Sequence, residues 1–305
     1  MTATSTIALT PADGQAYAAG MTRGREVTWR SAPGREWWVA TGAPAAALRP
    51  YVRQYQGYYE RAGGVAVRRH EPSIGVPMIF EMSADMRLST SVRTQAALTG
   101  HRSFVAGPSD GWAHSETHGT AHGIQVDLTP IGAYLFLGVP LDSLMNQAVE
   151  IDDILGSEGR ALVESLHQPT NALAFDAADR AIAARIARAK PASRPVVWAW
   201  QRIVESGGTV HIGALAERIG WSRKHLIARF REQIGLPPKT YARIVRFNRA
   251  VRMLDGLTTP RWAEIAASCG YYDQAHLIRD FAQFAGATPT DYIARRLPGG
   301  GVDGS

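Results

Sequence analysis

Two groups of side chains, 51 residues apart, combine residue types that can contact the edges of DNA bases. Arg and Lys donate to guanine, the Gln amide can bond adenine through both of its polar atoms, and Ile can contact a thymine methyl group. The groups are Arg223, Lys224 and Ile227, and then Gln274, Ala275, Ile278 and Arg279. Such residues read bases when a helix presents them to a major groove. The alternative, an ordinary solvated helix face, stays open at this point.

Histidines offer a second chemistry, metal binding. Five lie in the N-terminal half: His70, His101, His114, His118 and His122. The last three are spaced by four, which on a helix would align three imidazoles for a metal ion. Gly119, Thr120 and Gly123 favour a hairpin instead, and a turn would separate the rings. We therefore expect no metal site and no cofactor.

Enzymatic motifs are missing from the sequence. It contains no nucleophile elbow, no phosphate-binding glycine loop and no carboxylate pair, so we expect no catalytic residues and no enzyme activity. Cys269 is the single cysteine, which excludes a disulfide framework and a cysteine metal cluster. Cys269 lies on the apolar side of a predicted helix, where its thiol would be buried, so we do not expect it to accept an alkyl group as a reactive cysteine would.

The two groups of base-contacting residues occupy equivalent places in an internal repeat. The first copy contains Ala216, Gly220, His225, Leu226, Phe230, Gly235, Pro238 and Tyr241, and the second contains Ala266, Gly270, His276, Leu277, Phe281, Gly286, Pro289 and Tyr292. The offset is 50 residues up to the glycine and 51 after it. The second copy therefore has one extra residue in a turn.

Each copy predicts a helix, a tight turn and a second helix. Residues 212–219 carry apolar side chains with a helical period, and Gly220 can end that helix in a left-handed conformation. Ser222 can cap the next helix, whose Leu226 and Phe230 face inward. The equivalents in the second copy are Gly270, Asp273, Leu277 and Phe281. This order is a helix-turn-helix.

The segment from about Arg194 to Arg296 resembles the DNA-binding domain of AraC/XylS-type transcription regulators. The resemblance is carried by residues 270–277, Gly-Tyr-Tyr-Asp-Gln-Ala-His-Leu, and by the closing Gly-Ala-Thr-Pro of residues 286–289. It implies that residues 191–297 form an all-α domain with two helix-turn-helix units joined by one long helix. It also implies that each second helix enters a major groove. Phosphate contacts are predicted for Lys239, Thr240, Arg246 and Thr290.

Charge supports a polyanionic partner for this domain. Residues 194–305 contain 16 Lys and Arg against 9 Asp and Glu, whereas residues 1–193 contain 17 against 18. The positive excess therefore lies on the segment expected to bind double-stranded DNA. No apolar run approaches the length of a membrane helix, and no signal peptide pattern begins the chain, so we expect a cytoplasmic protein without a membrane partner.

The fold class expected is α+β. Residues 1–24 read as a flexible leader, residues 25–190 as a β-rich, barrel-like domain for effector sensing and dimerisation that ends in helices, and residues 298–305 as a flexible tail. Short aromatic and β-branched runs predict the strands. They lie near residues 37–39, 55–59, 65–67, 77–82, 86–89, 104–105 and 123–128. Helical periods follow at residues 131–137, 159–167 and 172–189, with a linker at 190–193.

The function expected is a sequence-specific transcription regulator that responds to a small-molecule effector bound by the N-terminal domain. A homodimer and a contact with RNA polymerase belong to this interpretation. The alternative is a β-barrel enzyme or metal-dependent sensor attached to a DNA-binding module. The two classes differ in whether the N-terminal domain holds a metal or a reactive group.

Overall fold

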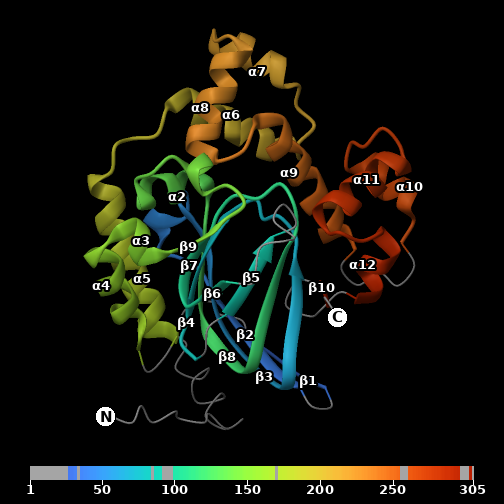
Figure 1. Ribbon diagram of the computed structural model, residues 1–305. Helices are drawn as coiled ribbons and strands as arrows, with labels where there is room; N and C mark the ends of the chain where they lie inside the picture. Colours follow the sequence, from blue (N-terminus) through green and yellow to red (C-terminus); the bar gives the residue numbers. More distant parts are fainter. Residues whose placement is uncertain are drawn as a thin grey trace, which may run out of the picture.

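The structure is a computed structural model that describes residues 27–32, 35–83, 86–90, 99–168, 171–254, 260–295 and 302–303. A curved sheet with helices on one side is followed by a purely helical domain (Figure 1). The α+β class and the order of the two domains are thus as predicted. The predicted leader, residues 1–24, lies outside the described residues.

The N-terminal domain is built on one antiparallel sheet. Its strands are β1 (Val27–Ala32), β2 (Arg35–Gly42), β3 (Val52–His70), β4 (Val76–Glu81), β5 (Met86–Thr90), β6 (Thr99–His101), β7 (Ser103–Ala106), β8 (Ala113–Leu128) and β9 (Ala148–Glu150). The main order is β1-β2-β3-β8-β4-β7-β9, with β5 and β6 attached beside β8. Among the described residues β1 and β9, the two ends of this order, do not pair, so the sheet is open. The term barrel-like, expected from the sequence, therefore describes the curved sheet only loosely.

The long strands β3 and β8 correct a second expectation. They pair from Val52 opposite Leu128 to His70 opposite Ala113, with a register shift between Arg61 and Val65. Residues 113–128 therefore form one strand rather than a hairpin. Gly119, with φ +70°, lies at the register shift, where one strand accommodates an irregularity that the sequence suggested was a turn. His114, His118 and His122 all lie on β8.

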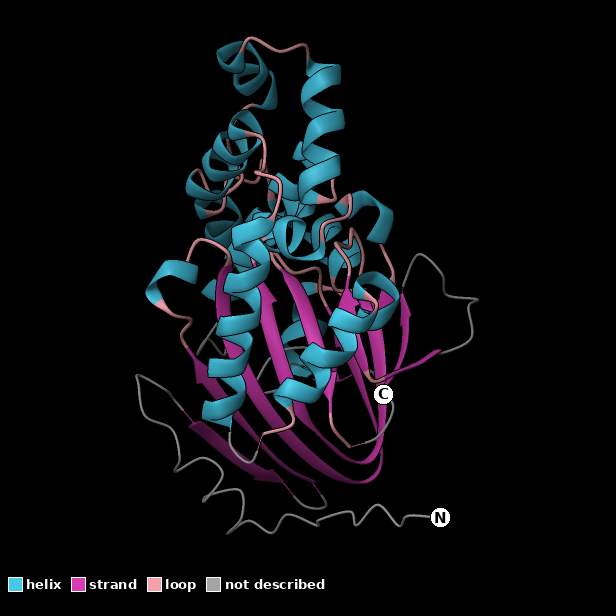
Figure 2. Cartoon of the chain, turned by 90° about the vertical axis from the view of Figure 1, so that its left-hand side faces the viewer, coloured by secondary structure: helices cyan, strands magenta, loops and turns pink. Residues whose placement is uncertain are grey.

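Helices cover the outer face of this sheet (Figure 2). They are η1 (Ala46–Leu48), α2 (Pro130–Leu137), η3 (Leu141–Leu144), α3 (Ile151–Leu155), α4 (Ser157–Leu166) and α5 (Asn171–Arg188). Tyr55 on β3 is fully buried there and stacks on Phe175 of α5 at 5.2 Å. Because side chains alternate along a strand, Gln54 and Gln56, which flank Tyr55, project from the inner face.

The C-terminal domain contains the two predicted helix-turn-helix units. Its helices are α6 (Arg194–Glu205), α7 (Ile212–Ile219), α8 (Arg223–Ile234), α9 (Pro238–Met253), α10 (Trp262–Ser268), α11 (Gln274–Phe284) and α12 (Pro289–Arg295). Gly220 ends α7 with φ +77°, as predicted. The Ser222 hydroxyl accepts from the His225 amide, and the Asp273 carboxylate accepts from the His276 amide at 2.7 Å. Both predicted N-caps are therefore present.

One hydrophobic core joins the two units through α9. Phe247 of α9 contacts Phe281 and Phe284 of α11 at ring distances of 4.9 and 5.4 Å. Arg243 donates to Asp280, whose side chain is fully buried, so this arginine stabilises the packing of α9 on α11.

Val302–Asp303, within the predicted tail, form β10 and pair with Arg68 and Arg69 of β3. Among the described residues, every helix is too short or too polar to cross a membrane.

Candidate nucleic-acid interface and ligand cavity

The seven residues predicted to read bases all lie on exposed positions of the second helices, α8 and α11. Their exposure follows from what faces inward, because Leu226 and Phe230 of α8 and Leu277 and Phe281 of α11 are completely buried. Two of the exposed side chains are large and apolar: Ile227 is 41% exposed and Ile278 is 37% exposed. The two units thus present equivalent surfaces.

The three cations among these seven residues are not neutralised by the part of the chain that the structure describes. Four arginines elsewhere in the domain each pair with a carboxylate: Arg202, Arg229, Arg243 and Arg261. Among the described residues, no carboxylate lies within ion-pair distance of Arg223, Lys224 or Arg279. Their positive charge is therefore available to a partner. Arg223 lies partly against α7, where its Nη2 sits 2.8 Å from the place that a Cβ on Gly213 would occupy.

The four predicted phosphate contacts are placed differently. Lys239 and Thr290 lie exposed in the first turns of α9 and α12, and Thr240 is half-buried beside Lys239. Arg246 packs its guanidinium 5.5 Å from the Tyr271 ring, and its buried Nε has no hydrogen-bond partner among the described residues. Arg246 thus connects α9 to the turn of the second unit, a structural role that the sequence did not indicate.

Other residues singled out in the sequence have packing roles. The rings of His225 and His276 contact Trp221 and Tyr271 at 4.4 and 5.1 Å. Cys269 is buried, with its sulfur 3.5 Å from that of Met253, and burial raises the pKa of the thiol. The described part of the chain brings no three His, Cys, Asp or Glu side chains together as metal ligands.

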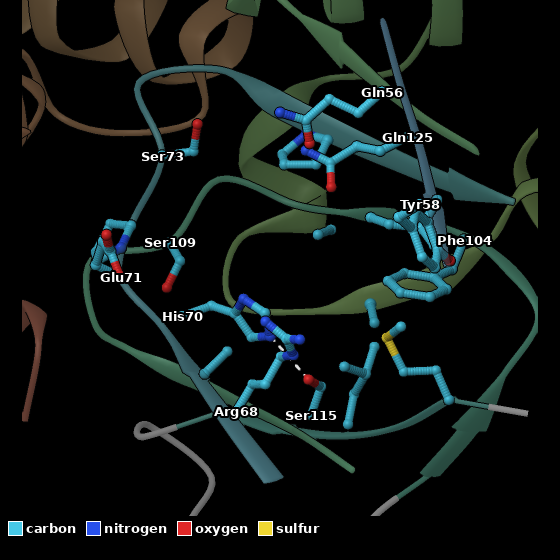
Figure 3. A pocket seen from close by; sticks show the side chains of 18 of the residues that line it. Gln56, Tyr58, Arg68, His70, Glu71, Ser73, Phe104, Ser109, Ser115 and Gln125 are labelled. Atoms are coloured by element: carbon cyan, nitrogen blue, oxygen red, sulfur yellow. Dashed lines mark hydrogen bonds between the residues drawn. The ribbon is translucent and has the colours of Figure 1, made fainter. Parts of the chain in front are cut away.

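A cavity of about 520 Å³ lies against the inner face of the sheet (Figure 3). Strand register builds its wall: Gln56 of β3 is opposite Gln125 of β8, Gln125 is opposite Ile79 of β4, and Ile79 is opposite Phe104 of β7. Directly opposite residues share a face of a sheet. This row of side chains therefore lines the cavity, whose size is typical of small-molecule sites.

The ionisable groups inside the cavity are held by neighbours. Arg68 donates to Glu60 through Nε and Nη2, at 3.2 and 2.7 Å. His70 is exposed and lines the cavity, and its Nε2 lies 2.8 Å from the Ser115 hydroxyl. Neighbouring protein atoms desolvate the ring, and this, with the charge of Arg68, lowers the pKa of His70 to about 4. The ring is therefore neutral at pH 7.

The loop between β3 and β4, residues 71–75, connects this cavity to the helical domain. The Tyr241 hydroxyl donates to the Ile74 carbonyl at 2.8 Å, the Asn248 amide donates to the Pro72 carbonyl at 2.9 Å, and the Tyr292 hydroxyl donates to Glu71 at 2.9 Å. Asn248 also lines the cavity itself. The bond from Asn248 joins positions 176 residues apart in two different domains, and no local pattern in the sequence indicates it.

Comparison with known proteins matches residues 215–295 to a helix-turn-helix domain, HTH_18, and residues 40–150 to a domain of unknown function, DUF6597. The F1 operon positive regulatory protein of Yersinia pestis is 36% identical over 89 residues, 29% of each chain. The uncharacterized HTH-type transcriptional regulator YbfI of Bacillus subtilis is 34% identical over 68 residues, 22% of this chain and 24% of that protein. The chain thus spans less than a third of these curated relatives.

A structure of ToxT from Vibrio cholerae is also similar, with 10% identity and a TM-score of 0.45 over 79% of this chain and 98% of that one. The helix-turn-helix match runs from α7 to the end of α12. It therefore includes both α8 and α11 with their seven exposed residues.

Proposed function

We propose that this chain, a member of the AraC/XylS family by its C-terminal domain, is a sequence-specific DNA-binding transcription regulator controlled by a small-molecule effector. The observation that carries the proposal is the pair of equivalent helices, α8 and α11, whose outward residues include Arg223, Lys224 and Arg279 without a described carboxylate partner. Unpaired cations on helices of a net-positive domain suit a polyanion.

The base-reading roles belong to the outward positions of both helices. Arg223, Lys224 and Arg279 would contact guanine edges, Gln274 an adenine, and Ile227 and Ile278 thymine methyl groups, with Ala275 allowing close approach. Lys239, Thr240 and Thr290 would contact phosphates and set the register of the domain on the duplex. Arg246 would contribute to phosphate binding only if its guanidinium left Tyr271.

The N-terminal domain would bind the effector in the cavity on the inner face of the sheet. Support comes from its size and from Asn248, which lines the cavity and belongs to the helix that joins the two DNA-binding units. A ligand touching the loop at residues 71–75 would therefore alter contacts made directly by α9. We propose no catalytic, metal or cofactor role for this domain.

The setting we propose is cytoplasmic, with a homodimer as the active form. RNA polymerase is a further proposed partner, supported by the name of the Yersinia relative, a positive regulatory protein. A dimer would place two copies of each reading helix on one site, which raises affinity through effective concentration.

Selection of bound duplexes from a random pool tests the proposal. We expect the full chain to enrich a sequence with two conserved elements about one helical turn apart. Affinity for that sequence should fall steeply between low and moderate salt, because neutralised phosphates release counterions. The variant with Arg223, Lys224 and Arg279 all changed to Ala should enrich nothing. A wild-type pool without an enriched sequence, or an affinity that ignores salt, would overturn the proposal.

A further inference from the structure

We infer that the cavity takes an uncharged organic molecule, with an apolar ring-sized body and an amide-type or hydroxyl group that pairs with the carboxamides of Gln56 and Gln125. The inference deepens the proposed function and rests on its effector site. It follows from three properties of the cavity: an unsatisfied polar wall, the absence of spare positive charge among the described lining residues, and an adjoining apolar wall.

The polar wall consists of carboxamides that have no hydrogen-bond partner among the described side chains. Gln56 and Gln125 lie directly opposite each other on β3 and β8, and their amides reach into the same space (Figure 3). Gln54 lies two residues before Gln56 and also lines the cavity. None of the three forms a side-chain hydrogen bond with a described residue. Each carboxamide offers two donors and one acceptor, so the group complements a ligand that both donates and accepts.

Charge in the cavity selects against anions. Four described lining residues other than tyrosines can ionise, and they are Glu60, Arg68, His70 and Glu71. Arg68 directs two donors at Glu60, and His70 contacts Ser115. Among the described lining residues no cation therefore remains without a carboxylate partner. A buried charge without a partner is strongly disfavoured.

Cations are also poorly served. Glu60 is engaged by Arg68, and the carboxylate of Glu71 accepts from Tyr292 across the domain boundary. A positively charged ligand would have to share Glu71 with the Tyr292 hydroxyl, the contact that holds α12. An uncharged ligand disturbs neither pair.

The apolar wall fixes the remaining character of the ligand. Ile79 and Phe104 continue the row that begins with Gln56 and Gln125, and Leu88 and Trp37 line neighbouring surface. A ring system packed on Ile79 and Phe104 would therefore carry its polar group within reach of the carboxamides. The volume of about 520 Å³ accommodates a two-ring molecule.

Three probes that share one ring system test the inference: 2-naphthamide, 2-naphthoate and 2-naphthylmethylammonium. Binding to the full chain at pH 7.5 is measured by calorimetry, without DNA. We expect the amide to bind at least tenfold more tightly than either ion. Equal or tighter binding of the carboxylate or the ammonium, or no binding of the amide at millimolar concentration, would overturn the inference.

Variants assign the preference to the carboxamides. Gln56→Leu and Gln125→Leu keep side-chain size and should each weaken amide binding about tenfold, whereas Gln201→Leu, on the exposed surface of α6, should not. Gln125→Glu should shift the preference to the ammonium probe, which a merely unstable variant would not do. Amide affinity unchanged in both Leu variants would refute the assignment. Duplex selection with the same preparations shows separately whether the proposed regulator function holds.

Discussion

Arg279→Ala is expected to remove discrimination at one base pair of the binding site while the fold stays intact. Arg279 is exposed on α11, and among the described residues no carboxylate lies within ion-pair distance. The substitution therefore breaks no ion pair of the free protein. The free energy of unfolding should change by no more than about 0.5 kcal/mol, as for other exposed positions.

The loss in binding follows from the contact that Arg279 can make. A guanidinium bonded to a guanine edge contributes roughly 1–3 kcal/mol of discrimination. This corresponds to a change of about 5-fold to 150-fold in the ratio of Kd values for the correct and incorrect base. The assay compares parent and variant across duplexes that each carry one base change. One position should lose its preference, and the others should keep theirs.

Lys239→Ala is the matched control for Arg279→Ala. Lys239 is also exposed, but it lies in the first turn of α9, where it faces phosphate rather than base edges in the proposed arrangement. Its removal should weaken all duplexes alike and reduce the salt dependence by about one phosphate contact. If the Arg279→Ala profile has the same shape as that of the parent, Arg279 does not read a base.

Three further outcomes are expected. Ser222→Ala and Asp273→Ala each remove an N-cap and should lower the free energy of unfolding by about 1 kcal/mol in urea titrations, with exposed Ser268→Ala as a control that has no effect. Asn248→Leu removes the bond to Pro72. It should reduce the change in duplex affinity that a cavity ligand produces, as measured by fluorescence anisotropy. A ligand effect equal to that of the parent would argue against communication through the Asn248–Pro72 bond. The pKa of His70 is lowered from its ordinary value of 6.5 to about 4, so the unfolded chain binds a proton at His70 more tightly than the folded chain does. The free energy of unfolding should therefore fall as the pH drops from 6.5 to about 4. His70→Gln should flatten the fall in Tm from pH 7 to 5, and an identical slope would contradict this assignment.

Local signals predicted the C-terminal domain well. The glycine that ends α7 and the caps at Ser222 and Asp273 act within a few residues, so their positions in the sequence fix helix ends directly. The inward Leu226 and Phe230 are four residues apart and need only the helical period. The outward residues of α8 and α11 could therefore be named before the structure was known.

Nonlocal pairing limited the prediction of the N-terminal domain. The runs at residues 55–59 and 65–67 belong to one strand, β3. They are joined because β8 pairs with β3 on both sides of the register shift between Arg61 and Val65. Gln56 and Gln125 are brought together only by that register. The alternation of Gln54, Tyr55 and Gln56 was a usable local signal, since it places a polar residue on each side of a buried aromatic.

The loop at residues 71–75 has a consequence for the spacing of DNA sites. It bonds Tyr241, which packs on Phe230 of the first unit, and Tyr292, which packs on Phe281 of the second. A single short segment of the sheet domain thus contacts both helix-turn-helix units. In the proposed arrangement on DNA, this loop, together with the core shared through α9, would set the rotation of α8 about the DNA axis relative to α11. One inserted base pair between the two elements of a site turns a groove by roughly 34–36°. In this arrangement the loop would set the rotational phase between the two elements of a site, and breaking its hydrogen bonds would let the protein accept sites with altered spacing.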